Sequence, residues 1–479
     1  MKRGSLSVVA TALALAACMG PRKPVPEGAA VAPPAAWRTD PGMAGIDVTP
    51  EWWRALGDPT LERLVTEALA HNTDLGIAVA RVDEADAQFR LARGDQLPSV
   101  TADGMGIGRR RTYSTLTGRG VEFSAYQAQL AVSFDADLFG KLRNRTAAAR
   151  AQLLATQAAG DAVRIAVVAG VVSRYVGLRT IDASIAVLSD TLDSRRKQLA
   201  LVDHQVREGY ADAITVSQAA AAVHQVEQQL ADAQLQQRQG EDALSVLLGS
   251  NPRAIERGRT LTDLPLLDAP TMLPSALLRR RPDIAEAEQQ IVAADRSLSS
   301  ARAAFLPNLT LNGTLGHLNA DVLPAALDIW SIGGSILAPI FQGGKLRAQA
   351  DIATAKRDQV AFNYRGTVLQ ALSEVEDALV ALRQKAAKER AAAATEAEQA
   401  KTLRASEHRF AQGRSSYLEV LDAERGLLSA RQALVTARSD RLMATVQLYQ
   451  ALGGGWRRPD EWPAASTPTA RAAPTPLHD

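Results

Sequence analysis

The chain has 479 residues, with 54 lysines and arginines against 52 aspartates and glutamates. This near balance, with no concentrated basic segment, argues against a nucleic-acid-binding protein, which needs a basic face. Aromatic residues make up only 4% of the chain, and long tracts rich in alanine, glutamine, leucine, arginine and glutamate favour long helices packed through small side chains.

The first 17 residues have the pattern of a secretory signal peptide. Two basic residues precede the apolar stretch Leu6–Ala17, which is too short to span a bilayer as a helix. The sequence Leu-Ala-Ala-Cys at 15–18 resembles the lipobox of bacterial lipoproteins, which implies cleavage before Cys18 and acylation of this residue, the only cysteine of the chain. By the same resemblance, Met19 implies the outer membrane. The alternative is an unlipidated signal peptide with an unrelated cysteine.

Two proline-free tracts, 99–251 and 340–457, permit long helices, because proline breaks a helix interior. These tracts also resemble each other at a constant offset of 204 residues. The matches are Gly140–Arg143 with Gly344–Arg347, Leu178-Arg179 with Leu382-Arg383, Gly209 with Gly413, and Leu248-Gly249 with Leu452-Gly453. A constant offset means no insertions, as expected of continuous helices, so the chain is predicted to be a tandem duplication.

The predicted organisation follows from this duplication. After the signal peptide (1–17) come an acylated N-terminal tether (18–50), a first repeat (51–251), a second repeat (252–453) and a disordered C-terminal tail (454–479). The first repeat is expected to hold a helix, a β-hairpin at about 97–135 and long helices at about 139–249. The second is expected to hold an equatorial segment and helix at about 252–304, a hairpin at about 306–339 and long helices at about 341–453. The helix predicted from Phe139 to Val206 would be on the order of 100 Å long.

Both hairpins alternate between apolar and polar residues. In the first, apolar and polar faces alternate from Ser124 to Asp135; in the second, Leu309, Leu311 and Leu315 alternate with threonines and an asparagine. Such alternation over about ten residues is typical of a membrane barrel strand, although one hairpin alone would suit an ordinary sheet. Four strands are too few to close around a pore, so closure would require several chains.

This arrangement resembles the TolC/OprM family of outer-membrane factors, specifically its lipidated branch of NodT-type efflux lipoproteins, over roughly residues 50–455. The resemblance rests on the duplicated unit, the lipobox, Leu278–Ile284 (Leu-Arg-Arg-Arg-Pro-Asp-Ile) and Gly413–Ala423 (Gly-Arg-Ser-Ser-Tyr-Leu-Glu-Val-Leu-Asp-Ala). It implies a fold that is mainly α with a membrane β-barrel: a homotrimer whose twelve-stranded barrel stands on a long α-helical periplasmic barrel.

The same resemblance implies a passive export duct for drugs or small toxic compounds, in a tripartite efflux system of a Gram-negative bacterium. The implied partners are a periplasmic adaptor (membrane fusion) protein, an inner-membrane transporter of the RND type and outer-membrane lipid, with no nucleic acid. No cofactor is expected apart from the covalent lipid on Cys18. Two alternatives stay open: a duct for protein or polysaccharide secretion, and a periplasmic coiled-coil scaffold lipoprotein, which would leave the alternating hairpins unexplained.

No catalytic or metal site is expected. The chain has no Gly-x-Ser-x-Gly elbow, and its six histidines are scattered without metal-ligand spacing. The sequence therefore does not predict an enzyme.

The functional residues are expected where the long helices turn. Gly209 and Gly413 are predicted to form the periplasmic tip turns and, with Arg414, to contact the adaptor. Glu419 and Asp422 share one helix face, and the resemblance implies that they point into the closed tip as a gate and cation filter, in threefold rings of carboxylates. The alternative is a solvated helix face. Phe410, Ser415 and Thr215 depart from the family pattern, so the contacts that lock the tip in relatives do not transfer.

Overall fold

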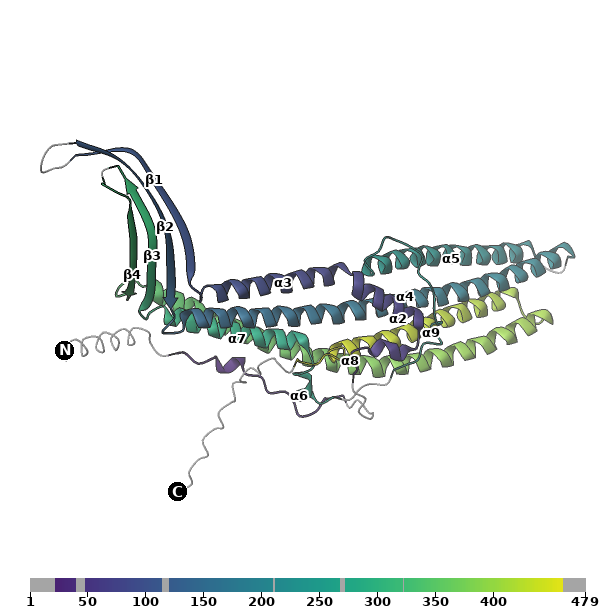
Figure 1. Cartoon of the computed structure of the whole chain (residues 1–479). Helices are drawn as coiled ribbons and strands as arrows, with labels where there is room; N and C mark the ends of the chain where they lie inside the picture. The colour runs from purple at the N-terminus through teal and green to yellow at the C-terminus, as the bar shows by residue number, and fades with distance from the viewer. Residues whose placement is uncertain are drawn as a thin grey trace, which may run out of the picture.

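Long helices and one curved sheet make up an elongated molecule in the computed structural model, which describes residues 22–39, 48–113, 120–209, 212–267, 272–321 and 323–459. The sheet lies at one end and two pairs of helices end together at the other (Figure 1). None of the helices in these ranges is long and apolar enough to cross a membrane.

The two repeats contain helices of equal length. Helices α4 (Lys141–Arg207) and α8 (Lys345–Ala411) have 67 residues each, and α5 (Ala213–Leu247) and α9 (Tyr417–Ala451) have 35 residues each. At 1.5 Å per residue, the longer helices measure about 100 Å. Both begin after a glycine with positive φ, +78° at Gly140 and +81° at Gly344. The helix predicted from Phe139 to Val206 is therefore α4, with bounds shifted by one or two residues.

Shorter helices precede each hairpin. They are η1 (Glu27–Ala29), η2 (Trp52–Leu56), α2 (Pro59–His71), α3 (Thr73–Gly94), α6 (Pro274–Leu277) and α7 (Pro282–Ala303). Two of them start at side-chain caps, which satisfy backbone N–H groups that lack a partner in the first turn. The Asp58 carboxylate accepts from the N–H groups of Thr60 and Leu61 in α2, and the Asn72 side chain accepts from those of Asp74 and Leu75 in α3.

A matching contact closes both repeats. In the first, Asn72 Nδ2 donates to the carbonyl of Leu247 at 2.8 Å; in the second, Arg281 donates to the carbonyl of Ala451, also at 2.8 Å. Next to these carbonyls, Gly249 and Gly453 have φ of +71° and +89°. A Cβ on either glycine would overlap a backbone carbonyl, that of His71 or of Arg280. The duplication therefore preserves a close backbone approach that only glycine allows.

The four strands form one antiparallel sheet in chain order. They are β1 (Ser99–Tyr113), β2 (Gly120–Ala136), β3 (Asn308–Ala320) and β4 (Leu327–Leu337). The central pair β2–β3 joins the hairpin of one repeat to that of the other. Within the described chain, β1 and β4 each pair on one side only, which leaves two open sheet edges.

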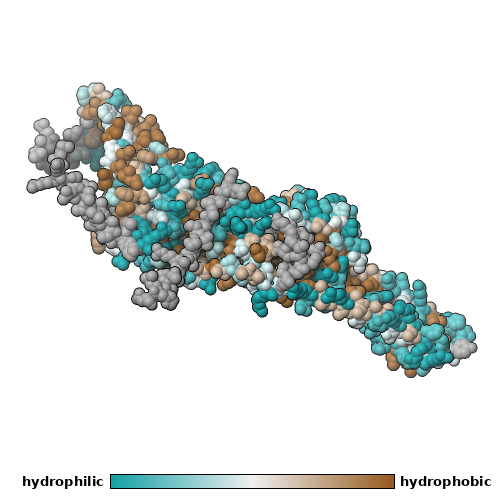
Figure 2. Space-filling model, turned by 90° about the horizontal axis from the view of Figure 1, so that it is seen from below, coloured by the Kyte–Doolittle hydropathy of each residue, from teal (hydrophilic) through white to brown (hydrophobic). Residues whose placement is uncertain are grey.

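The curvature of the sheet distinguishes its two faces (Figure 1). Along β2, odd-numbered side chains from Phe123 to Ala131 are buried or half-buried, whereas even-numbered ones from Tyr126 to Val132 are exposed. Side chains on a concave face shield one another, so the odd-numbered face is the concave one. The convex face is largely apolar and exposed, with Leu315, Trp330 and Ile332 at 62%, 73% and 86%, and Figure 2 shows hydrophobic residues gathered over the strands. The alternation predicted from the sequence is confirmed.

The main core lies where α2 and η2 pack against the middle of α4 and the ends of α5 and α9. It contains Trp52, Leu61, Tyr175, Leu244 and Leu448, all at most 3% exposed. The buried polar groups within it are paired: the Tyr175 hydroxyl donates to the Asp58 carboxylate at 2.7 Å and accepts from the N–H of Gly258. This core fixes the long helices at mid-length, so their distal ends depend on smaller local contacts.

The segment 22–39, which the composition predicts to be a tether, packs against α8. Arg357, only 1% exposed, donates to the carbonyls of Lys23 at 2.8 Å and Pro24 at 3.0 Å. Farther along α8, Glu376 accepts from the N–H groups of Arg38 and Thr39. Residues 22–39 therefore form a docked strap, whose carbonyls are held by arginines that the linker composition does not reveal.

The C-terminal tail begins later than predicted. Gly454 and Gly455 are buried, and Arg458 forms an ion pair with Glu288 of α7, so residues 454–459 belong to the folded part. This corrects the predicted start of the tail at 454. Residues 460–479 lie outside the described residues.

Candidate functional site

The candidate site is the end of the helices farthest from the sheet (Figure 1). There α4 is followed by Gly209 and α8 by Gly413, with φ of +77° and +69°, and no atom lies within 4 Å of where their Cβ atoms would be. The glycines end both helices in the left-handed conformation. Arg414, next to Gly413, is exposed.

Glu419 and Asp422 lie in the first two turns of α9, on its exposed side. The Glu419 carboxylate is 47% exposed and lies 3.5 Å from the guanidinium of Arg409 on α8. Leu418 and Arg425 are exposed on the same side, while Val420 and Leu421 face the interior. As predicted from their spacing, Glu419 and Asp422 share one face of α9, and in the single chain this face is exposed to solvent.

A small apolar cluster holds the two helix pairs together behind this face. It consists of Val202 of α4, Ala219 and Ala222 of α5, and Tyr417, Val420 and Leu421 of α9. Phe410 packs against Tyr417, with ring centroids 5.7 Å apart. Burial, and then the nearby Glu424 carboxylate, raise the pKa of Tyr417 to about 12. Phe410, one of the residues that depart from the expected family pattern, therefore contributes packing to the tip.

A buried ion pair lies beside this cluster and was not predicted from the sequence. Arg195 of α4 and Glu424 of α9 are 2% and 6% exposed, and Arg195 Nε lies 3.5 Å from Glu424 Oε2. Arg195 also donates to the carbonyl of Ala222 on α5 at 2.8 Å. Burial raises the pKa of Glu424 and lowers that of Arg195, so desolvation outweighs their attraction. The pair connects α4, α5 and α9 through one side chain.

The described part of the chain contains neither the predicted lipidation site nor a metal site. Cys18 lies outside the described residues. Within the described ranges, no group of three or more histidine, cysteine, aspartate or glutamate side chains could hold a metal ion.

Sequence comparison identifies relatives along almost the whole chain. The family model described as "Outer membrane efflux protein" matches residues 64–250 and 273–454, one match in each repeat. The antibiotic efflux pump outer membrane protein ArpC of Pseudomonas putida is 34% identical over 476 residues, covering 95% of this chain and 96% of its own. The cation efflux system protein CusC of Escherichia coli O6:H1 is 33% identical over 416 residues, covering 85% of this chain and 88% of its own.

The fold is shared with solved channel structures. The CmeC outer membrane channel of Campylobacter jejuni superimposes with a TM-score of 0.83 at 25% identity, covering 92% of this chain and 95% of its own. Together with the helix pairs and the four-stranded sheet, these matches make the identification direct. The chain belongs to the outer membrane efflux protein family, whose members are channel and transport proteins and not enzymes.

Proposed function

We propose that three copies of this chain form the outer-membrane exit duct of a tripartite efflux pump. The duct carries drugs or other small toxic compounds across the periplasm and the outer membrane, and it has no catalytic cycle and no cofactor. Relatives named for antibiotic and for cation efflux support a small-molecule cargo. A periplasmic adaptor contacts the tips at Gly209, Gly413 and Arg414, and an inner-membrane transporter, of the RND type, supplies the energy.

The open edges of the sheet carry this proposal. Strand β1 has 15 residues and β4 has 11, and in the described chain nothing covers their outer edges. Long unpaired edges are normally blunted or paired. Pairing β1 of one copy with β4 of the next satisfies both edges, and three copies with four strands each close a twelve-stranded barrel. The exposed apolar convex face then meets lipid, and the concave face lines the pore.

Near the helices, the concave face of the sheet carries polar side chains, as a water-filled pore requires. Thr310 Oγ1 donates to the Asp135 carboxylate at 2.6 Å, and the hydroxyls of Thr314 and Ser331 lie 2.7 Å apart. The rows of Thr310 and Thr314, with the row of Ser133 and Asn312 between them, lie on the side of the sheet opposite Leu130 and Leu315. Water and hydrated solutes can therefore pass along this face.

We infer that the gate lies at Glu419 and Asp422. Threefold symmetry turns each residue into a ring of three carboxylates, and like charges held together attract cations and repel anions. We predict that replacing both residues by alanine reduces the preference for cations over anions severalfold and increases leak current. Bilayer recordings of the reversal potential in a salt gradient measure this preference.

The matched control for this prediction is Glu398→Ala. Glu398 is an exposed carboxylate on the same helix pair, 72% exposed and 2.7 Å from Lys401. Its removal should leave selectivity unchanged. If the double variant at the gate behaves like this control, Glu419 and Asp422 are solvated residues and not a filter.

The docked strap supports a lipid anchor at Cys18. Arg357, which holds the carbonyl of Lys23, lies twelve residues into α8 and hence about 18 Å below the end of that helix nearest the sheet. The five residues from Lys23 back to Cys18 can span at most about 17 Å. A lipid on Cys18 can therefore come close to the sheet-facing end of α8, near the membrane surface of the proposed assembly.

Changing Cys18 to serine should abolish acylation. We predict complete loss of palmitate incorporation during growth on radiolabelled palmitate, because the chain has no second cysteine. Intact mass spectrometry of the purified wild-type protein should show a mature chain that starts at Cys18 and carries the added acyl groups. An unmodified chain, or label retained by the serine variant, would contradict the anchor.

A further inference from the structure

The concave face of the sheet changes character at the end far from the helices. A cavity of about 330 Å³ opens there, and its lining is almost entirely apolar. The lining side chains are Met105, Ile107, Phe123, Ala125, Gln127, Leu318, Ala320 and Leu323. We call the seven apolar members of this set the outer apolar cluster.

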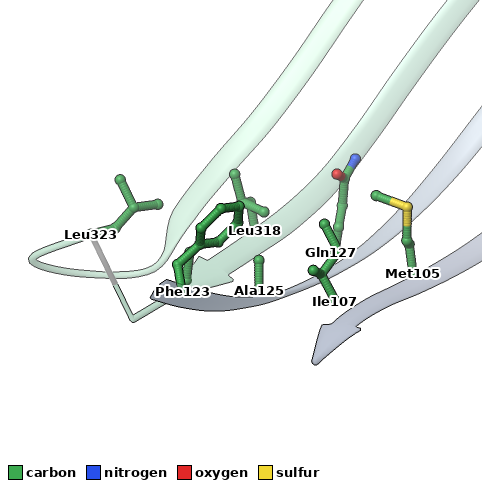
Figure 3. Close-up of a pocket in the computed structure, with 8 residues that line it drawn as sticks. Met105, Ile107, Phe123, Ala125, Gln127, Leu318 and Leu323 are labelled. Atoms are coloured by element: carbon green, nitrogen blue, oxygen red, sulfur yellow. The ribbon is translucent and has the colours of Figure 1, made fainter. Parts of the chain in front are cut away.

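The strand register places these side chains on one face. Ile107 lies opposite Ala125, which lies opposite Ala320; one row closer to the helices, Met105 and Leu318 flank Gln127. Figure 3 shows the side chains projecting together from the strands, with Leu323 on the loop beyond β3. Ala125 and Ala320 are 9% and 8% exposed, so the floor of the cavity is closed. Met105 at its edge is 57% exposed, so one side is open.

This cluster is not explained by the lipid-facing pattern of the sheet. Alternation puts apolar residues on the convex face and polar residues on the concave face, and the rows with Thr310 and Thr314 obey this rule. The outer apolar cluster breaks the rule on the face that lines the pore in the proposed assembly. A water-facing apolar surface in a defined hollow marks a binding site more often than chance.

The chemistry of the lining limits what can bind. No charged side chain lines the cavity, and the amide of its one polar residue, Gln127, already donates to Gln129 at 2.8 Å. A charged molecule would lose its hydration without gaining a partner there. An uncharged apolar molecule would bury its surface against methyl, thioether and aromatic groups.

We propose that the outer apolar cluster is a weak binding site for small, uncharged, apolar molecules on the pore wall, in its outer half. This inference rests on the proposed function, because it requires the concave face to line a pore. Binding is weak because one side of the cavity is open, which suits a surface that must release what it binds. Three copies of the chain give three such sites around the outer mouth.

Photolabelling tests this site. The full-length protein in lipid nanodiscs is titrated with trifluoromethyl-phenyl-diazirine, a small uncharged probe, then irradiated and mapped by mass spectrometry. We expect labelling at Met105, Phe123 or Leu318 that saturates with probe concentration. Labelling at Trp330 and Ile332 on the convex face should rise linearly, because it reflects probe dissolved in lipid.

A size-preserving variant and a control on the same face complete the test. Met105→Gln together with Leu318→Gln should weaken saturable labelling about tenfold, while Thr314→Val, nearer the helices, should leave it unchanged. Concave-face labelling that never saturates, or that ignores the glutamine variant, overturns the proposal. The wild-type titration decides the matter even if the variant fails to fold.

Ion conductance measured on the same wild-type sample distinguishes failure of the outer binding site from failure of the proposed duct. A conducting protein without saturable labelling means that the pore exists and the outer site does not. If neither the wild type nor the variant with both Glu419→Ala and Asp422→Ala conducts, and no saturable labelling is seen, the proposed function itself fails.

Discussion

Replacing Arg195 by alanine is expected to destabilise the tip end of the helices by about 3–5 kcal/mol, because it leaves a buried charge without its partner. Glu424 would keep its buried carboxylate, and the carbonyl of Ala222 would lose its side-chain donor. Hydrogen exchange of the full-length protein, followed by mass spectrometry, measures local opening. Peptides covering 187–202 and 417–428 should exchange much faster than in the wild type.

The neighbouring residue provides the control. Arg196 is 55% exposed and pairs with Glu227 at 2.8 Å, so Arg196→Ala should cost less than about 1 kcal/mol. The Arg195 side chain points from α4 toward α5 and α9, whereas that of Arg196 faces solvent. Equal exchange in the two variants would show that the buried pair does not hold the helix pairs together.

The Arg195 variant should also respond to pH in a defined direction. Burial raises the pKa of Glu424, Arg195 opposes this rise, and Glu407 adds to it. Because the pKa of Glu424 is raised in the folded state, folding favours the protonated carboxyl. The stability that this protonation contributes is full below the unfolded pKa and is lost as the pH rises through the folded pKa. Without Arg195 the pKa of Glu424 rises further. The stability that the Arg195→Ala variant loses relative to the wild type should therefore be smallest in acid and grow toward neutral pH.

Replacing Gly249 by alanine is expected to cost about 3 kcal/mol or more, through two separate effects. Its φ of +71° is strained for any residue with a Cβ, and that Cβ would overlap the carbonyl of His71, at 2.7 Å from the carbonyl carbon. The clash is with backbone, so it can be relieved only by moving α2 away from the end of α5. Recovery of assembled protein from the outer-membrane fraction and its melting temperature measure the loss.

Gly209 separates these two effects. Its φ is +77°, yet nothing lies within 4 Å of its added Cβ, so Gly209→Ala carries only the conformational cost of about 1 kcal/mol. Gly453→Ala should behave like Gly249→Ala, because its Cβ would overlap the carbonyl of Arg280 in the equivalent place of the second repeat. A Gly249 variant as mild as the Gly209 variant would mean that the close approach is not needed.

The sequence predicted well the features that depend on residue periodicity or on the positions of proline and glycine. The absence of proline predicted that the long helices start at about 139 and 341, and the glycines at 209 and 413 predicted where the first helix of each pair ends, all within a few residues of the bounds of α4 and α8. Period-two alternation predicted which residues of β2 share a face, because side-chain direction in a strand depends only on parity. The family resemblance, which the comparison confirms, added the expectation that such units assemble as a trimer.

The features that sequence missed depend on contacts between distant segments. Arg195 and Glu424 look like any other charged residues of a long helix, and only their packing makes them a buried pair. The proline- and alanine-rich segment 22–39 looks like a free linker, because its docking depends on arginines of α8, including Arg357, more than 300 positions away. The sequence did not predict the outer apolar cluster, because its members come from β1, β2, β3 and a loop and meet only in the folded sheet.

Electron imaging of the full-length protein purified in detergent, with its mass determined in solution, tests the central claim most directly. The proposed duct predicts three times the mass of one chain and a hollow cylinder well over about 100 Å long, since α4 and α8 alone account for that length. At the outer end, the image should show a closed barrel in which β1 of each copy pairs with β4 of the next. A monomer, a solid rod or a particle whose sheet edges stay open would contradict the duct.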